Sequence, residues 1–265
     1  MLEESFKEYM QLFGMYSCVQ SYLESFNLKD LLTELRINNL EGYLDQARHF
    51  SLKEAKKRDE ILFRYFGPEG IERIVNSVLE SIILPSDTGL LDILDVGAGT
   101  GLLTSKIVDR IKSHLPNASF FAMDLTPEML KVLASKRRDI VPIVGIIEKI
   151  RESVLYSSRF FALPDKFDVI ISILTLHHVT DVEKALSSLR ESVKPSGRVI
   201  VVDLCKHEFD EFREEMGDIH LGFDPAEFQK LAVNYFSQIL IEKMQGICCT
   251  SSGRSVELFK AVLTP

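Results

Sequence analysis

The stretch Leu94-Asp95-Val96-Gly97-Ala98-Gly99-Thr100-Gly101 decides how this chain folds. It ends an apolar run that begins at Leu91, and it leads into a segment with the apolar spacing of a helix, Leu102–Val108. In open α/β sheets, ligands bind at the carboxyl ends of the strands, where a glycine-rich turn lets the backbone approach a nucleotide. The turn therefore predicts a nucleotide-type site.

Short apolar runs separated by helix-like segments surround this turn. They are Leu91–Val96, Ser119–Met123, Val141–Ile147, Phe167–Ile173 and Arg198–Val202. Such alternation predicts right-handed crossovers, and hence a parallel sheet with helices on both faces. Two later runs, Gln238–Lys243 and Val256–Val262, are joined across residues 246–253 and are expected to pair antiparallel. We predict an α/β, Rossmann-like sheet of seven strands, mostly parallel with an antiparallel last strand.

The chain before the turn has a helical pattern. Between residues 5 and 81 the apolar residues recur at three- and four-residue steps, and the Gly67-Pro68 pair interrupts this pattern. A turn-forming stretch, Pro85–Gly89, then separates the helices from the first strand. We expect residues 1–88 to form a helical lid or dimerisation segment and residues 89–265 to form the nucleotide-binding domain.

Composition excludes several classes of protein. A formal net charge of -8 and the lack of long Lys/Arg runs argue against an extended nucleic-acid footprint. The four cysteines form no CxxC pair, so neither a disulfide framework nor a closed zinc site is expected. The sequence has no apolar stretch near the roughly 18 residues of a membrane span and no signal peptide. We predict a cytoplasmic protein.

The glycine spacing separates two classes of nucleotide site. Dinucleotide-binding turns need glycine or alanine five residues after the first glycine, where this chain has Leu102. Glycine stands instead at Gly101, which gives the pattern Gly97-x-Gly99-x-Gly101. This pattern resembles motif I of class I methyltransferases that use S-adenosylmethionine (SAM).

The resemblance extends from about Leu91 to Val202. Besides the glycine turn it rests on two further motifs, Asp124-Leu125-Thr126-Pro127-Glu128-Met129-Leu130 and Ser172-x-x-x-Leu176-His177-His178-x-x-Asp181. The three motifs in this order look like the subgroup related to ubiquinone/menaquinone biosynthesis methyltransferases. The segment Leu189-Arg190-x-x-x-Lys194-Pro195-x-Gly197 is similar to the turn that precedes the fifth strand in that subgroup.

The resemblance implies SAM as cofactor and S-adenosylhomocysteine as its product. It implies that the backbone of Gly97, Ala98 and Gly99 faces the methionine and ribose parts of the cofactor. It also implies that Asp124 accepts both ribose hydroxyls, as an acceptor-only carboxylate can. The cofactor-binding residues it predicts are Asp95, Gly97, Ala98, Gly99, Gly101, Asp124, Leu125, Met129, Ile146, Ile147 and Ser172.

One position departs from the family pattern. Where the family carries Gly-Asp after the third strand, this chain has Gly145-Ile146, followed by Ile147 and Glu148. The acid that binds the adenine amine is therefore missing at position 146. A backbone carbonyl, Glu148 or water must take its place.

Three histidines follow strand ends at the predicted ligand edge of the sheet. His177 and His178 come after the fourth strand, and His207 comes after the fifth. A histidine with a pKa near neutral is the usual general base, so His178 and His207 are candidate catalytic residues. Alternatively, the pair His177-His178 caps and packs the turn between strand and helix. His207, Asp210, Glu211 and His220 lack a compelling ligand spacing, and no metal site is expected.

These observations favour a SAM-dependent methyltransferase that acts on a small-molecule acceptor, without nucleic acid or a membrane span, and with a possible homodimer through the N-terminal helices. A non-catalytic SAM sensor or scaffold remains an alternative, because no obvious base accompanies the missing adenine acid. A protein or RNA methyltransferase is another alternative. The Asn/Asp-Pro-Pro-Tyr motif of base amino-group methylation is absent at residues 172–175.

Overall fold

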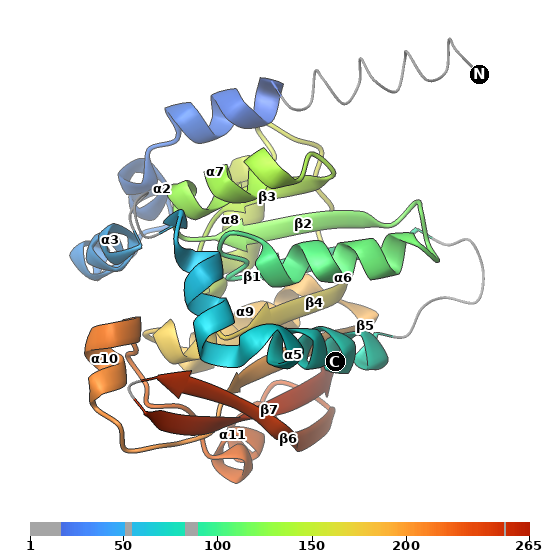
Figure 1. Cartoon of the computed structure of the whole chain (residues 1–265). Helices are drawn as coiled ribbons and strands as arrows, with labels where there is room; N and C mark the ends of the chain where they lie inside the picture. The colour runs from blue at the N-terminus through green and yellow to red at the C-terminus, as the bar shows by residue number, and fades with distance from the viewer. Residues whose placement is uncertain (1–16, 51–54, 83–89, 252) are drawn as a thin grey trace.

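A computed structural model describes residues 17–50, 55–82, 90–251 and 253–265. A seven-stranded sheet forms the centre of the molecule, with strand order β3-β2-β1-β4-β5-β7-β6 (Figure 1). The strands are β1 Asp92–Val96, β2 Ser119–Asp124, β3 Ile140–Val144, β4 Phe167–Ile173, β5 Val193–Leu204, β6 Gln238–Ser251 and β7 Arg254–Thr264.

Parallel pairing joins the first five strands, and β7 is antiparallel to both of its neighbours. The predicted architecture is thereby confirmed. The parallel strands run in the same sense, so their carboxyl ends share one edge of the sheet. The glycine turn and the residues that follow β2, β3 and β4 therefore meet at that edge.

Helices cover both faces of the sheet (Figure 1). In chain order they are α2 Leu28–Glu34, α3 Leu40–His49, α5 Arg58–Ser81, α6 Leu102–Lys112, α7 Pro127–Lys136, α8 Ile150–Ser157, α9 Val182–Ser192, α10 Glu211–Met216 and α11 Pro225–Ala232. Residues 17–25 are also helical. Two short 3₁₀ helices, η1 Ile147–Lys149 and η2 Leu176–His178, follow β3 and β4 at the ligand edge.

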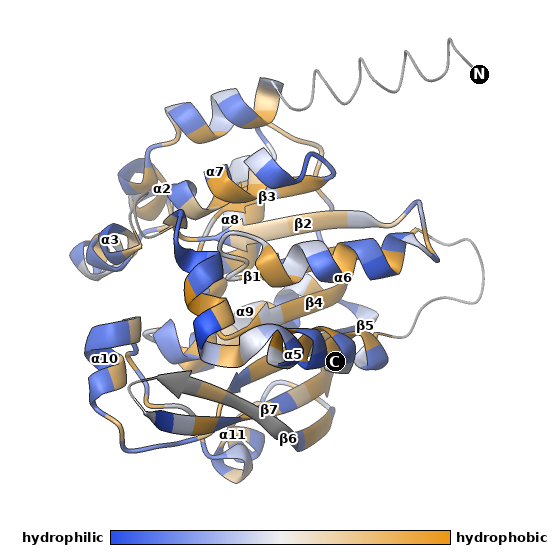
Figure 2. Cartoon of the chain, viewed as in Figure 1, coloured by the Kyte–Doolittle hydropathy of each residue, from blue (hydrophilic) through white to orange (hydrophobic). Residues whose placement is uncertain are grey.

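Burial on both faces explains the composition of the central strands. Figure 2 shows hydrophobic colouring along β2 and β4, and mixed colouring along α5 and α6. Two clusters of buried side chains result, one on each side of the sheet. Parallel strands covered on both faces read as continuous apolar runs, whereas helices need only one apolar face.

Several strand boundaries differ from the prediction. The third strand was expected to reach Ile147, but it ends at Val144 because the N–H of Ile146 turns aside to the Ser153 hydroxyl (3.2 Å). The fifth strand begins at Val193 and not at Arg198. Its pairing with β4 shifts register between these two residues, so the predicted turn residues 194–197 lie within the strand. Strand β6 extends to Ser251, and β7 already begins at Arg254. The pairing of β6 with β7 shifts register between Met244 and Cys248.

The N-terminal helices pack into the same core as one face of the sheet. Leu31 and Leu32 of α2 and Ile74 of α5 are fully buried in one cluster with residues of β1 and β2. A kink at Gly67, which has a left-handed φ of 64°, divides α5 into two parts. Residues 1–16, 51–54 and 83–89, including the expected domain boundary, lie outside the described residues. The division at residue 88 stays a prediction.

Candidate functional site

The glycine turn is held open by hydrogen bonds to the next strand. The N–H groups of Gly97 and Ala98 both donate to the Met123 carbonyl, at 2.8 and 3.0 Å. Gly97, Gly99 and Gly101 have φ values of 78°, 55° and 75°, a left-handed region that favours glycine. Glycine at these three positions therefore lets the turn follow this path without backbone strain.

Two of these glycines also lack room for a side chain. A Cβ on Gly97 would lie 2.1 Å from the Thr175 hydroxyl oxygen, and one on Gly101 would lie 2.8 Å from the Leu133 side chain. By contrast, no atom lies within 4 Å of the position that a Cβ on Gly99 would take. The backbone of Gly99 thus borders open space.

Asp124 joins the glycine turn to the end of β2. Its carboxylate accepts the N–H of Gly99 at Oδ2 and the N–H of Thr126 at Oδ1, both at 2.8 Å. Burial raises the pKa of Asp124, and these backbone hydrogen bonds oppose the rise. Each carboxylate oxygen can accept more than one hydrogen bond, so capacity for a ligand remains.

Asp95 is buried beneath the turn at 4% exposure. Its Oδ2 accepts the hydroxyl of Thr104 on α6 at 2.5 Å. Burial raises the pKa of Asp95 to about 7, although this hydrogen bond counteracts the rise. The contact fixes the start of α6 against β1 and so positions the turn between them.

A cavity opens beside the turn and contains about 1060 Å³ of space free of protein atoms, its open mouth included. Cofactor and ligand pockets commonly span about 300–1,000 Å³. Most of its wall comes from the carboxyl ends of the parallel strands. The lining residues from the sheet edge are Asp95–Thr100, Leu102, Leu103, Asp124–Thr126, Met129, Gly145–Glu148, Ile173–Thr175, His178 and Val179.

Helix α3 and the first part of α5 complete the wall. Tyr43, Gln46 and Phe50 line the cavity from the α3 side, and Arg58 and Leu62 line it from α5. Two hydrogen bonds tie α3 to the sheet edge. The Tyr43 hydroxyl donates to Glu148 Oε1 at 2.7 Å, and the Gln46 amide donates to the His178 carbonyl at 2.6 Å.

The start of α5 also contacts the glycine turn directly. The Thr100 hydroxyl donates to Asp59, and Lys136 of α7 binds the same carboxylate at 2.5 Å. Arg58 lies over the Phe50 ring, with 5.3 Å from its guanidinium carbon to the ring centroid. Burial lowers the pKa of Arg58, whereas Tyr65 and Asp124 favour its charged form.

The cavity gathers nearly all of the predicted cofactor residues. Asp95, Gly97, Ala98, Gly99, Asp124, Leu125, Met129, Ile146 and Ile147 all line it. Gly101 ends the turn next to it, as the N-cap of α6. Ser172 is fully buried in β4, and the chain instead presents Ile173, Leu174 and Thr175 to the cavity.

The candidate catalytic histidines lie in different surroundings. His178 lines the cavity, and its Nε2 is buried with no hydrogen-bond partner among the described residues. His207 does not line it, and its ring packs beside Phe209 and Phe212 at 5.4 and 4.8 Å between centroids. The geometry thus favours His178 over His207 as a residue that meets a ligand.

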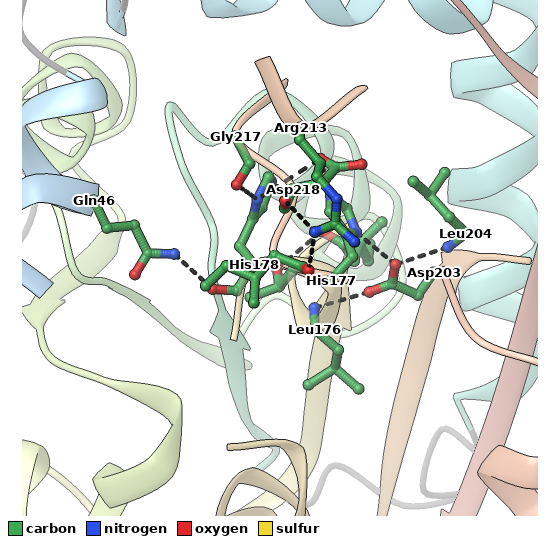
Figure 3. Close-up of polar contacts among 12 residues, drawn as sticks. Gln46, Leu176, His177, His178, Asp203, Leu204, Arg213, Gly217 and Asp218 are labelled. Atoms are coloured by element: carbon green, nitrogen blue, oxygen red, sulfur yellow. Dashed lines mark hydrogen bonds and ion pairs between the residues drawn. The ribbon is translucent and has the colours of Figure 1, made fainter. Parts of the chain in front are cut away.

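His177 does not line the cavity and instead belongs to a buried polar cluster (Figure 3). Its Nδ1 lies 2.5 Å from Asp203 Oδ1, and its Nε2 lies 3.7 Å from Asp218 Oδ1. Burial opposes protonation of His177, but the carboxylates of Asp203 and Asp218 outweigh it and raise the pKa. Burial lowers the pKa of His178, and the neighbouring His177 and Arg58 lower it further.

Several wall residues carried too weak a signal in the sequence. Tyr43, Gln46 and Arg58 stand in helices before the glycine turn, where their spacing is that of an ordinary amphipathic segment. Thr175 stands beyond the end of β4, as the N-cap of η2, whereas Ser172 is buried within the strand. Asp218 follows the short helix α10, and only the tertiary fold brings it to His177.

Comparison with known proteins agrees with this geometry. A family model described as a methyltransferase domain matches residues 94–199, which run from the end of β1 into β5. Residues 94–199 form a class I methyltransferase domain. The match includes the glycine turn, Asp124 and the cavity residues after β3 and β4.

Curated relatives resemble the same part of the chain. The ubiquinone/menaquinone biosynthesis C-methyltransferase UbiE of Vibrio vulnificus is 35% identical over 120 residues, which cover 44% of this chain and 43% of that protein. The enzyme of the same name from Idiomarina loihiensis is 33% identical over 116 residues, with the same coverage. The matched region thus spans less than half of the length of these relatives.

Solved structures share the fold of the methyltransferase domain. Magnesium protoporphyrin IX methyltransferase of Synechocystis, solved with bound S-adenosylhomocysteine, has a TM-score of 0.59 at 13% identity and covers 84% of this chain and all of that chain. Phosphoethanolamine N-methyltransferase 2 of Haemonchus contortus, in complex with SAM, has a TM-score of 0.58 at 15% identity. The match covers 91% of this chain and 60% of that chain. At these identities the likeness concerns the fold.

Proposed function

We propose that this chain binds SAM in the cavity beside the glycine turn and transfers its methyl group to a small-molecule acceptor. The observation that carries the proposal is the open backbone at Gly99, bonded to Asp124 at 2.8 Å within the matched domain. A ligand can approach this backbone closely because no side chain covers it. The two curated relatives described above are named as C-methyltransferases of ubiquinone/menaquinone biosynthesis, which supports a small-molecule acceptor.

The residues around the cavity fit the parts of the cofactor. Asp124 offers its remaining acceptor capacity to ribose hydroxyls. Ile146 and Ile147 are buried apolar walls suited to an adenine ring, and Glu148 stands beside them with its pKa raised by burial. Tyr43 occupies one oxygen of Glu148, so we assign the other oxygen to the adenine amine. This would replace the acid missing at position 146.

The chain contributes alignment and exclusion of water. When bound, SAM supplies a methyl group on a sulfonium, which makes the transfer an in-line displacement. Holding donor and acceptor in one geometry provides much of the acceleration of such a step. Helix α3 and the first part of α5 wall off the cavity, and we infer that the bonds from Tyr43 and Gln46 keep this wall closed over the ligands.

If the methyl acceptor must lose a proton, we assign His178 as the base that removes it. It lines the cavity, whereas His207 does not. No side chain or backbone group of the described residues forms a hydrogen bond with Nε2 of its neutral imidazole. General bases need such a nitrogen within hydrogen-bond reach of the acceptor.

Calorimetric titration with SAM and with S-adenosylhomocysteine tests the proposed function. We expect one ligand per chain for each compound, in competition with the other. Turnover of labelled SAM with a panel of small molecules then identifies the acceptor. Well-folded protein that binds neither compound would exclude SAM as the ligand.

Substitution of Gly99 by alanine should weaken SAM binding at least tenfold with little change in the folded state. The new Cβ would meet no protein atom, so it would enter the space assigned to the ligand. An alanine at position 99 must also keep the left-handed φ of 55°, which adds backbone strain of roughly 1–2 kcal/mol. Calorimetry with SAM measures the binding, and thermal unfolding measures the stability.

The matched control for this variant is Gly253→Ala. Gly253 also has a left-handed φ, 75°, and open space around its Cβ position, but it lies in the β6–β7 turn. It should show similar strain with unchanged SAM affinity. Equal affinities in the two variants would mean that the ligand does not approach Gly99.

The remaining alternatives differ in measurable ways. A SAM sensor or scaffold would bind the cofactor without any acceptor-dependent product. A protein or RNA methyltransferase would label a macromolecule from a mixed panel in preference to small molecules. The net charge of -8 favours the small-molecule acceptor, because a polyanionic substrate would be repelled.

The cellular setting and the assembly stay predictions. No helix among the described residues is both long and apolar enough to span a bilayer. We propose a cytoplasmic location, and we propose that the N-terminal helices act as a lid or join two chains into a dimer. Sedimentation velocity of the full chain tests the dimer.

A further inference from the structure

The buried cluster behind the cavity wall contains a set of metal-binding groups. Among the described residues, one group of three, His177, His178 and Asp218, places one ligand atom from each side chain within 4.8 Å of the others. The histidines belong to η2, and Asp218 follows α10 (Figure 3). This set differs from the one considered in the sequence, His207, Asp210, Glu211 and His220.

Asp218 is the unusual member of the cluster. Its side chain is fully buried, and neither carboxylate oxygen has a hydrogen-bond partner among the described residues. The nearby Arg213 donates to the backbone carbonyls of Asp218 and Ile219 rather than to this carboxylate. Buried polar groups nearly always have partners, because an unpaired buried carboxylate is strongly destabilising. The Asp218 carboxylate thus keeps acceptor capacity that a cation could use.

The spacing around Asp218 suits a metal ion better than direct hydrogen bonds. Asp218 Oδ1 lies 3.7 Å from His177 Nε2 and 3.9 Å from His178 Nδ1. Both distances are too long for hydrogen bonds. Donors around a tetrahedral zinc ion, with bonds of about 2.0–2.2 Å, lie roughly 3.3–3.5 Å apart. The two distances from Asp218 exceed this range by only a few tenths of an ångström, and all three donors lie within 4.8 Å of one another.

Asp203 supplies the supporting contact that metal-binding histidines usually have. Its Oδ1 accepts from His177 Nδ1 and from the N–H of Leu204 at 2.7 Å, and its Oδ2 accepts the N–H of Leu176 at 2.8 Å. A carboxylate held by three donors fixes the proton of His177 on Nδ1. The lone pair of Nε2 then points toward Asp218, as in carboxylate–histidine–zinc triads.

We propose that His177, His178 and Asp218 bind a zinc ion, with Asp203 as the residue that orients His177. Two imidazoles and one carboxylate are a common ligand set for zinc, and a fourth position remains for water. His178 Nδ1 now donates to the Gly217 carbonyl at 3.1 Å; to bind the metal it would give up this bond, and the ring proton would move to Nε2, so His178 could remove a proton from an acceptor only in the zinc-free chain. Since His178 also lines the cavity, the ion would lie directly behind the wall of the acceptor site.

Metal binding to the full chain, freed of metal by a chelator, tests the proposal independently of SAM. Titration with Zn²⁺ by calorimetry should give one ion per chain, and Co²⁺ should give the visible absorption of a four- or five-coordinate site. Asp218→Asn keeps the shape of the side chain but removes its charge. It should raise the Kd for Zn²⁺ at least tenfold. The control His114→Gln removes an exposed histidine on another face and should leave the Kd unchanged.

A second readout distinguishes a ligand from a structural carboxylate. In metal-free protein, Asp218→Asn removes an unpaired buried charge, so its melting temperature should equal or exceed that of the parent chain. Added Zn²⁺ should raise the melting temperature of the parent chain but not that of the variant. If Asp218→Asn does not fold, His178→Gln replaces it in the same titrations. Zinc binding that is absent, or equal in parent and variant, would overturn the site, whatever the result for SAM.

Discussion

Replacing Asp124 with alanine should weaken SAM binding by about 1.5–3 kcal/mol, the scale of hydrogen bonds to a charged group. That loss corresponds to a Kd roughly 10–150 times higher. Two effects add in the same direction. The ribose hydroxyls lose their proposed acceptor, and the N–H groups of Gly99 and Thr126 lose the carboxylate that holds the turn. Calorimetry with SAM and S-adenosylhomocysteine measures the change.

Two further variants separate these effects. Asp124→Asn retains one acceptor oxygen, so its affinity should lie between those of the parent chain and Asp124→Ala. Asp165→Ala removes the same charge from an exposed position outside the cavity and should bind SAM normally. If Asp124→Ala bound SAM as tightly as the parent chain, the ribose assignment would be wrong.

Asp95 should make the folded state less stable as the pH rises from about 4 to 7. Burial raises the pKa of Asp95 from its ordinary value of 3.8 to about 7 in the folded chain, although the hydrogen bond from Thr104 lowers it. Between these values the folded state keeps a proton that the unfolded state has released. The stabilisation is complete below pH 4 and is lost through pH 7, with a slope of about 1.4 kcal/mol per pH unit for one proton.

Chemical denaturation at several pH values measures this dependence. Asp95→Asn cannot titrate, so its free energy of unfolding should rise relative to that of the parent chain as the pH increases from about 4 to 7. Asp165→Asn serves as the exposed control, with no such relative change. If Asp95→Asn and the parent chain varied in parallel with pH, the carboxyl of Asp95 would be ionised in the folded state throughout this range.

The sequence predicted the fold well because its signals are local. The glycine turn, the apolar strands and the helix-starting Thr126-Pro127 pair are each read within a few residues. Strand ends were less certain, since they depend on distant partners. The third strand stops at Val144 because the N–H of Ile146 donates to the hydroxyl of Ser153, a residue of the following helix α8.

The candidate site was predictable on the side formed by the sheet and not on the side formed by the helices. Residues that follow β1, β2 and β3 share an edge in any parallel sheet, so Asp124 and Ile146 could be placed from their motifs. Tyr43 and Arg58 reach the cavity through the packing of helices, which no periodicity specifies. Asp218 meets His177 only because the chain returns after β5 to the same edge.

The left-handed residue Gly67 gives α5 two separate duties. The part before it carries Arg58 and Leu62 into the cavity wall, and the part after it is anchored in the core through Ile71 and Ile74. Changes in the first part can therefore alter which molecules the cavity admits while the second part preserves the fold. Evolution, or an engineer who wishes to change the methyl acceptor, has an exchangeable segment at residues 58–66.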